Sequence, residues 1–166
     1  MKISFLSDNL QRKISFLNHA VSSRGQLPIL SNFLLEAKNG KLTISATDLE
    51  IGISSNIAVN IETEGRITIP AKNFSDLLTN LGSQKITLSL DGETVVLKGE
   101  KVNASFQTMP AEDFPKLYEE KGEELTTFKK TEIEENILRV VFAAAQDSGR
   151  PALSGIFLNE NRPNLI

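Results

Sequence analysis

The sequence predicts an α+β fold that repeats one unit, in which a strand is followed by a helix and then by further strands. Two apolar strand patterns flank Asn39-Gly40. Asn-Gly between apolar runs is the strongest short-range signal for a β-hairpin, because both residues tolerate a positive φ angle. Amphipathic helix patterns begin near residues 8, 71 and 131. This spacing of about sixty residues indicates an internal repeat.

The first unit begins with a short strand over residues 1–6. Ser7 and Asp8 are good N-cap candidates for the helix that follows. This helix is expected to have one apolar and one polar face. The apolar positions are Leu10, Ile14, Leu17 and Val21, widened by Phe16 and Ala20, and the polar positions are Arg12, Ser15, His19 and Ser22. Gly25 is expected to end the helix, and strands are expected over 33–37, 42–46 and 51–61.

The second unit follows the same order. A strand over 66–69 leads to Pro70, which fits the first turn of a helix. Phe74, Leu77, Leu78 and Leu81 form its apolar face, whereas Lys72, Asp76 and Thr79 point away. A hairpin of strands 86–90 and 95–97 around Asp91-Gly92 follows, and then a strand over 102–108. Residues 109–117 are expected to be irregular, and the acidic stretch 118–124 is expected to be a linker.

A third unit begins and is left incomplete. It has a predicted strand over 125–128, capping-box spacing between Thr131 and Glu134, a helix to about Gln146, a loop and one more strand. A shift of 123 residues places Leu10, Ile14, Leu17 and Val21 on Ile133, Ile137, Val140 and Ala144, and Pro28, Leu30 and Ser31 on Pro151, Leu153 and Ser154. We therefore expect one domain over 1–122 and the start of a second, similar domain over 123–166.

Composition excludes several functions. The chain has no cysteine, so it has no disulfide, thiolate nucleophile or Cys-ligated zinc. No Gly-rich phosphate loop or dinucleotide fingerprint occurs, and no nucleotide cofactor is expected. The N-terminal apolar run is too short for a secretion signal, and no stretch approaches the roughly 20 apolar residues of a membrane span, so the cytoplasm is the expected location. The net charge is −3, yet residues 1–26 carry an excess of three positive charges.

A few residues are candidates for chemistry or binding. Asp48 and Glu50 lie two apart on an expected strand, so both carboxylates would point to one face. Such a pair can bind a metal ion or divide acid and base roles, or it can simply discourage pairing at a strand edge. His19 is the only histidine, and no Gly-x-Ser-x-Gly nucleophile motif accompanies it. Arg24, at the end of the first helix, can stabilise the helix dipole or contact a ligand.

Five segments together carry a family resemblance. They are LPILSNFLLEA, GKLTISATDLE, EGRITIPAKNF, MPAEDFP and QDSGRPALSG. In their order and spacing, from Met1 to about Leu158, the chain resembles the β subunit of bacterial DNA polymerase III, the replicative sliding clamp. The resemblance implies a DNA-clamp fold of pseudo-symmetric βαβββ units, with helices on one face of antiparallel sheets. It also implies a ring of two subunits with three domains each, whose helices surround duplex DNA. The match covers the first domain and the beginning of the second.

The resemblance also implies roles for individual residues. Arg24 matches a DNA-contacting arginine, and Arg12 and His19 point towards the channel. Lys72 matches a position that serves either the channel charge or the ring interface. In the family the loop 147–149 also approaches DNA, although here it begins with an acidic residue. Arg150 and Leu153 match two residues of the pocket that receives short peptide motifs of partners. Without the resemblance, Leu153 reads as a core residue and Arg150 as a loop charge.

The function implied by the resemblance is non-catalytic. The clamp is a processivity factor in DNA replication that binds duplex DNA, and it binds DNA polymerase III and the clamp loader through short linear motifs. It needs no metal, cofactor or membrane. The full-length family forms a homodimeric ring, whereas this apparently truncated chain is expected to be monomeric. Two alternatives remain, namely a metal-dependent hydrolase that uses Asp48 and Glu50, and a clamp fragment without activity of its own.

Overall fold

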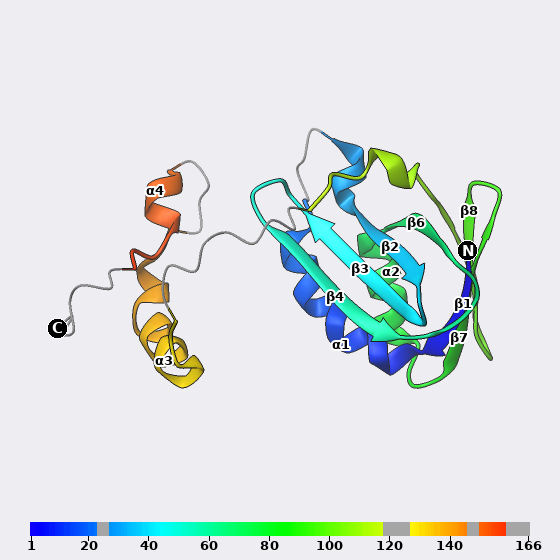
Figure 1. Ribbon diagram of the computed structural model, residues 1–166, viewed down its shortest axis with the longest axis horizontal. Helices are drawn as coiled ribbons and strands as arrows, with labels where there is room; N and C mark the ends of the chain where they lie inside the picture. Colours follow the sequence, from blue (N-terminus) through cyan, green and yellow to red (C-terminus); the bar gives the residue numbers. More distant parts are fainter. Residues whose placement is uncertain (23–26, 118–126, 146–149, 159–166) are drawn as a thin grey trace. The chain divides into compact units, whose positions relative to one another are not determined.

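The computed structural model describes residues 1–22, 27–117, 127–145 and 150–158. The chain divides into two compact units, Met1–Tyr118 and Glu119–Ile166, and each is described by itself (Figure 1). The first unit contains two antiparallel sheets, and the described part of the second unit is helical.

The elements of the first unit follow the predicted order of strand, helix and strands twice. The first half contains β1 (Lys2–Leu6), α1 (Ser7–Leu17), the 3-10 turns η1 (Asn18–Ala20) and η2 (Pro28–Ser31), β2 (Asn32–Lys38), β3 (Lys41–Thr47), β4 (Gly52–Ala58) and β5 (Asn60–Thr63). The second half contains β6 (Gly65–Pro70), α2 (Ala71–Asn80), β7 (Lys85–Asp91), β8 (Thr94–Lys98), β9 (Asn103–Gln107) and η3 (Ala111–Asp113). The predicted α+β fold of repeated units is confirmed.

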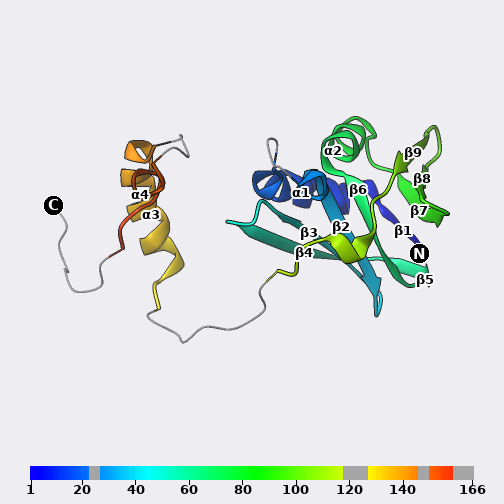
Figure 2. The same ribbon diagram turned by 90° about the horizontal axis from the view of Figure 1, so that it is seen from above.

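The two halves exchange their first strands. One sheet has the order β5-β1-β7-β8-β9, and the other has the order β4-β3-β2-β6. Thus β1 of the first half pairs with β7 of the second, and β6 of the second half pairs with β2 of the first. Both helices lie on the same side of β2, β3 and β4, as Figure 2 shows. Because each sheet contains strands from both halves, neither half has a complete sheet alone.

The main core lies between the helices and the sheets. It collects the apolar stripe of α1, the apolar stripe of α2 and the inward positions of the strands. Its largest fully buried side chains are Phe33, Phe74, Ile3, Leu10, Leu17, Leu35, Leu42, Ile44, Ile69, Leu78, Ile86 and Leu88. The rings of Phe74 and Phe106 meet edge to face, with centroids 6.0 Å apart, an arrangement that aromatic pairs prefer. The core therefore fixes both helices against the sheets.

The predicted Asn-Gly hairpin is present between β2 and β3. Asn39 and Gly40 have φ angles of 52° and 74°, and Lys38 pairs with Lys41 across the turn. The turn is anchored from outside the hairpin, because the backbone N–H of Asn39 donates to Glu64 Oε1 at 2.9 Å. The second predicted turn is also present, with a φ of 59° at Gly92.

The predicted cap of α1 is wrong. Leu6 occupies the N-cap position and no side chain caps the helix. Ser7 is fully buried, and its hydroxyl donates to the carbonyl oxygen of Gly82 at 2.6 Å and accepts from the backbone N–H of Gln84 at 3.0 Å. The loop after α2 leaves these backbone groups without helical or sheet partners, so the serine hydroxyl serves them instead of the helix end. Similarly, Pro70 ends β6 and precedes α2 as its N-cap residue.

Phe16 does not belong to the apolar face of α1, contrary to the prediction. Its side chain is 68% exposed, whereas Leu10, Ile14 and Leu17 are buried. Successive residues in an α-helix are turned by about 100°, so Phe16 lies beyond the edge of the stripe that these three residues form. Ala20, which was also expected to widen that face, is fully buried.

The second unit reproduces the start of the first unit at the predicted shift of 123 residues. Its elements are α3 (Lys130–Val140), η4 (Val141–Ala143) and α4 (Pro151–Ser154), which correspond to α1, η1 and η2. Backbone hydrogen bonds correspond as well. Ser22 N–H donates to Leu30 O at 3.2 Å, and the shifted pair, Ala145 N–H and Leu153 O, is 2.9 Å apart. The sequence repeat is therefore also a structural repeat.

Several details of the third unit differ from expectation. The helix begins after Lys129 without a side-chain cap, so the capping box does not form, and it ends at Val140 rather than near Gln146. Thr127 and Phe128 are not in a strand, and residues 155–158 are not either. A strand needs neighbouring strands as hydrogen-bond partners. In the first unit β2 pairs with β3 and β6, whereas the described part of the second unit contains no strand that could pair in this way. The predicted linker 118–124 lies outside the described residues.

Candidate nucleic-acid interface

The outward face of α1 is the first part of the candidate interface. Leu10, Ile14 and Leu17 anchor the opposite face of α1 in the core, which turns Arg12 and Phe16 to solvent. His19, in η1, is also exposed, and its Nδ1 atom lies 3.3 Å from the carbonyl oxygen of Phe16. The structure thus places the predicted residues Arg12 and His19 on one exposed surface, as expected from the helical spacing.

Lys72 joins this surface through the packing of α1 and α2. Gln11 Nε2 donates to Thr79 O at 3.4 Å, and Ser75 Oγ donates to Asn18 Oδ1 at 3.1 Å. These two contacts show that the helices are antiparallel, so the first turn of α2 lies at the same end of the pair as η1. The exposed Lys72 is therefore at the end where His19 lies. The sequence could not predict this proximity, because the pairing is between residues 57 positions apart.

Arg24, the leading candidate from the sequence, lies outside the described residues, and so does Gly25. The structure does describe the two flanks of this segment. Ser22 N–H donates to Leu30 O at 3.2 Å, so both flanks meet close to the end of η1. The contact assigned to Arg24 remains a prediction.

The cations on the helix side belong to no salt bridge of the described ranges, although Asp8 and Asp76 lie one helical turn from Arg12 and Lys72. Over the described ranges, the salt bridges are Lys2–Glu62, Arg66–Glu36 and Lys130–Glu134. None of these pairs includes Arg12, Lys13 or Lys72. Their charges are therefore available to an external anion.

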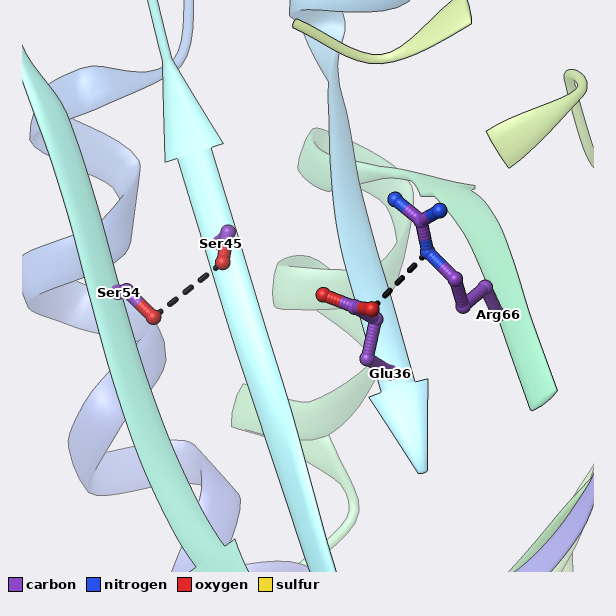
Figure 3. Close-up of polar contacts among 4 residues, drawn as sticks. All are labelled: Glu36, Ser45, Ser54 and Arg66. Atoms are coloured by element: carbon purple, nitrogen blue, oxygen red, sulfur yellow. Dashed lines mark hydrogen bonds and ion pairs between the residues drawn. The ribbon is translucent and has the colours of Figure 1, made fainter. Parts of the chain in front are cut away.

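The other face of the β4-β3-β2-β6 sheet carries mostly polar side chains, apart from the buried Leu34, and several of them pair with one another. Arg66 Nε lies 3.0 Å from Glu36 Oε1, and Ser45 Oγ donates to Ser54 Oγ at 3.3 Å. Figure 3 shows both pairs on the side of the sheet that is turned away from the helices. Successive side chains of a strand point to opposite faces of the sheet, so the residues between the buried ones point to this face. This face also carries Lys38 and Lys41 at the β2-β3 turn, which are exposed and belong to none of the salt bridges of the described ranges.

The carboxylates of Asp48 and Glu50 belong to a turn and not to a strand. The strand β3 ends at Thr47, so Asp48 and Glu50 lie in the turn to β4 and not on one strand face, contrary to the prediction. Asp48 Oδ1 accepts from the backbone N–H groups of Glu50 at 3.0 Å and Ile51 at 2.7 Å. The carboxylate holds a turn in which Leu49 has a φ of 79°. Within the described residues, no group of three or more potential metal ligands occurs.

Of the two pocket residues expected in the second unit, Leu153 lines the hollow found there and Arg150 does not. Leu153 is 54% exposed and lines a shallow apolar hollow. The hollow is lined by Val140, Ala143, Ala144, Leu153, Gly155, Ile156 and Phe157. Arg150 is exposed and is not among these residues, although its carbonyl oxygen accepts from Leu153 N–H at 2.9 Å. The sequence reasoning missed Ile156 and Phe157, which the apolar run after Gly155 signals.

Among the described residues, no helix is long and apolar enough to cross a membrane.

Comparisons with known proteins agree with this architecture. The beta sliding clamp of Synechocystis sp. is 30% identical over 174 residues, which cover 99% of this chain and 44% of that protein. The beta sliding clamp of Escherichia coli is 29% identical, over 94% of this chain and 43% of that protein. The chain therefore spans less than half the length of these curated relatives.

Solved structures give the same result. The pol III beta of Caulobacter crescentus matches with a TM-score of 0.87 at 27% identity, covering 96% of this chain and 44% of that one. The DNA polymerase III subunit beta of Pseudomonas aeruginosa matches with a TM-score of 0.83 at 27% identity, covering 93% of this chain and 43% of that one. The fold is that of the clamps.

Residues 1–118 match a family model described as the DNA polymerase III beta subunit, N-terminal domain. This range is the unit in which two interlocked halves place α1 and α2 on one side of their sheets. Because the match includes well over half of the sequence, the chain belongs to the DNA polymerase III beta subunit family.

Proposed function

We propose that this chain forms the DNA-facing part of a sliding clamp subunit, which keeps a replicative DNA polymerase on its template. The observation that carries the proposal is that the packed helices α1 and α2 expose Arg12, His19 and Lys72, in the unit that matches the beta subunit family model. Within the described ranges, Arg12, Lys13 and Lys72 belong to no salt bridge. A surface of this kind attracts phosphates without reading bases.

The mechanism is physical and uses no chemical group of the protein. A ring around duplex DNA is retained by topology, and contacts to phosphates have no preferred register, so the ring can slide. In this proposal Arg24, Arg12, His19 and Lys72 contact the DNA backbone. Each contributes charge and orientation rather than sequence specificity.

The partners belong to the same proposal. The relatives named beta sliding clamp support a role in DNA replication beside DNA polymerase III and its clamp loader, and such a protein would work in the cytoplasm of a bacterium. Leu153 and the apolar hollow around it would receive the short peptide motif of a partner, with Arg150 nearby. Residues 1–122 are proposed as the first clamp domain and 123–166 as the start of the second.

The assembly state is also a proposal. A closed homodimeric ring requires three domains in each subunit of the family, and this chain spans less than half the length of its relatives. We propose that the 166-residue chain alone is a monomer. Light scattering at micromolar concentration would give the mass of one chain, and a stable closed dimer would contradict the proposal.

Salt-dependent DNA binding tests the proposed interface. Fluorescence anisotropy with a labelled duplex, repeated at several salt concentrations, gives the slope of log affinity against log salt. Arg12→Ala and Arg24→Ala should each weaken binding to all duplex sequences about equally and reduce the slope by about 1. Lys38→Ala is the matched control, because this exposed cation lies at the end of β2 and not on the helices.

Two outcomes would contradict the proposed interface. If the control and the helix-side variants weaken binding equally, the contact is not located on α1. If the wild-type chain does not bind duplex DNA at low salt, it is a clamp fragment without DNA-binding activity of its own. Thermal unfolding of each variant separates a lost contact from lost folding.

A further inference from the structure

Phe16 has no role in the core or in the proposed phosphate contacts. It is the one large apolar side chain of α1 that is exposed, at 68%, and α1 lies entirely within the described ranges. The helix already buries a complete apolar stripe through Leu10, Ile14 and Leu17, so packing within the chain does not explain the ring. A partner that covered this ring would gain the free energy of removing it from water.

The neighbours of Phe16 define the chemistry of that partner. On a helix, residues three and four positions apart are adjacent on the surface, which places Lys13 and Arg12 one turn before Phe16. His19 follows by three positions and is tied to the Phe16 carbonyl through Nδ1. Arg12 and Lys13 are exposed and outside every salt bridge of the described ranges. The nearest acid on the helix, Asp8, is eight positions from Phe16.

An aromatic ring flanked by cations is complementary to a strand that carries both phosphates and exposed bases. Duplex DNA offers the phosphates, but its bases are stacked inside the helix and cannot cover a phenyl ring. A single strand offers both, and the stacking of a base on an aromatic side chain is tolerant of sequence. The charge pattern and the exposed ring therefore distinguish a single strand from a duplex as the ligand.

We propose that the outward face of α1 binds single-stranded DNA, with an unpaired base stacked on Phe16 and the adjoining phosphates held by Arg12 and Lys13. This inference rests on the proposed function, since it places nucleic acid on the same helix. It adds a second ligand class to that surface, namely the unpaired strand beside a duplex. Arg12 would then act on both ligands, whereas Phe16 would act only on the unpaired strand.

The test compares two ligands across matched variants of the full chain. Fluorescence anisotropy at low salt measures the affinity for oligo(dT) of about 20 nucleotides, longer than a typical single-strand site, and for a duplex of about 20 base pairs. Phe16→Ala should weaken oligo(dT) binding about tenfold and leave duplex binding within about twofold. Phe16→Tyr, which keeps a stacking ring, should restore oligo(dT) binding.

Two controls complete the design. Phe142→Ala removes a phenyl ring that is 84% exposed, in η4, and should change neither affinity. Arg12→Ala should weaken both ligands. If Arg12→Ala weakens duplex binding while Phe16→Ala leaves oligo(dT) binding unchanged, the proposed function survives and this inference is overturned.

Other outcomes also reject the inference. If wild type does not bind oligo(dT) at low salt, the face is not a single-strand site. If Phe16→Ala instead abolishes a concentration-dependent self-association seen by sedimentation, the ring is covered by a second copy of the chain. Equal losses for oligo(dT) and duplex would show that Phe16 supports the shape of α1 rather than a stacked base.

Discussion

The Ser7 hydroxyl connects the start of α1 to the loop after α2, and its removal is a sharp test of the structure. Ser7→Ala deletes a donor to Gly82 O at 2.6 Å and an acceptor for Gln84 N–H at 3.0 Å. Ser7 is fully buried, so water cannot simply replace its hydroxyl. The two bonds are partly buried, and a typical hydrogen bond contributes about 0.5–1.5 kcal/mol, so Ser7→Ala should lower the free energy of unfolding by about 1–3 kcal/mol.

The matched control for this variant is on the same helix. Ser15 is exposed, and its hydroxyl has only a long contact of 3.4 Å to Arg12 O. Ser15→Ala should change stability by less than about 0.5 kcal/mol, because alanine also favours the helix more than serine does. Denaturant unfolding with circular dichroism gives both values. A loss of about 2 kcal/mol should lower the thermal midpoint of a unit of this size by roughly 6–12 °C. If the two alanine variants have equal stability, Ser7 does not bridge the halves.

Two further predictions concern the core and the second unit. Phe74→Ala should lower the free energy of unfolding by about 3–5 kcal/mol, because the fully buried ring leaves a cavity and loses its edge contact with Phe106, whereas Phe16→Ala should stay within about 0.5 kcal/mol of wild type. Equal losses measured by denaturant unfolding would show that Phe16 is part of the core. Amide hydrogen exchange should be faster in α3 than in α1, since α3 has no buried residue and α1 has Ser7, Leu10, Ile14 and Leu17. Equal protection, measured by mass spectrometry, would show that α3 is covered as well as α1 is.

The apolar side chains of α3 show the physical origin of that difference. Val140 is 46% exposed, while Leu17, at the corresponding position of α1, is fully buried. The helices have the same length and matching sequence patterns, so their local propensities do not separate them. In the first unit the stripe of α1 is covered by α2 and by the sheets. Most helical stability in proteins comes from such packing, and this is what the described part of the second unit lacks.

The candidate interface was predictable in part. Arg12 and His19 follow from helical spacing, because a buried stripe determines which side chains remain outside. The proximity of Lys72 to His19 depends on the antiparallel contact of two helices, which local patterns do not encode. The prediction that Asp48 and Glu50 share one strand face was wrong for a local reason. Asp48 accepts hydrogen bonds from the turn N–H groups of Glu50 and Ile51. An Asp at a strand end is a common turn residue for this reason.

The sequence by itself determined the features that depend on neighbouring residues. The Asn39-Gly40 turn follows from backbone sterics, the helix stripes follow from a period of 3.6 residues, and the 123-residue repeat follows from like patterns giving like elements. Only the tertiary structure decided the exchange of β1 and β6 between the halves, the bridge made by Ser7 and the lack of a strand over the described residues 155–158. Each of these depends on a hydrogen-bond partner far along the chain or missing from the described part. A strand pattern becomes a strand only when another strand satisfies its backbone groups.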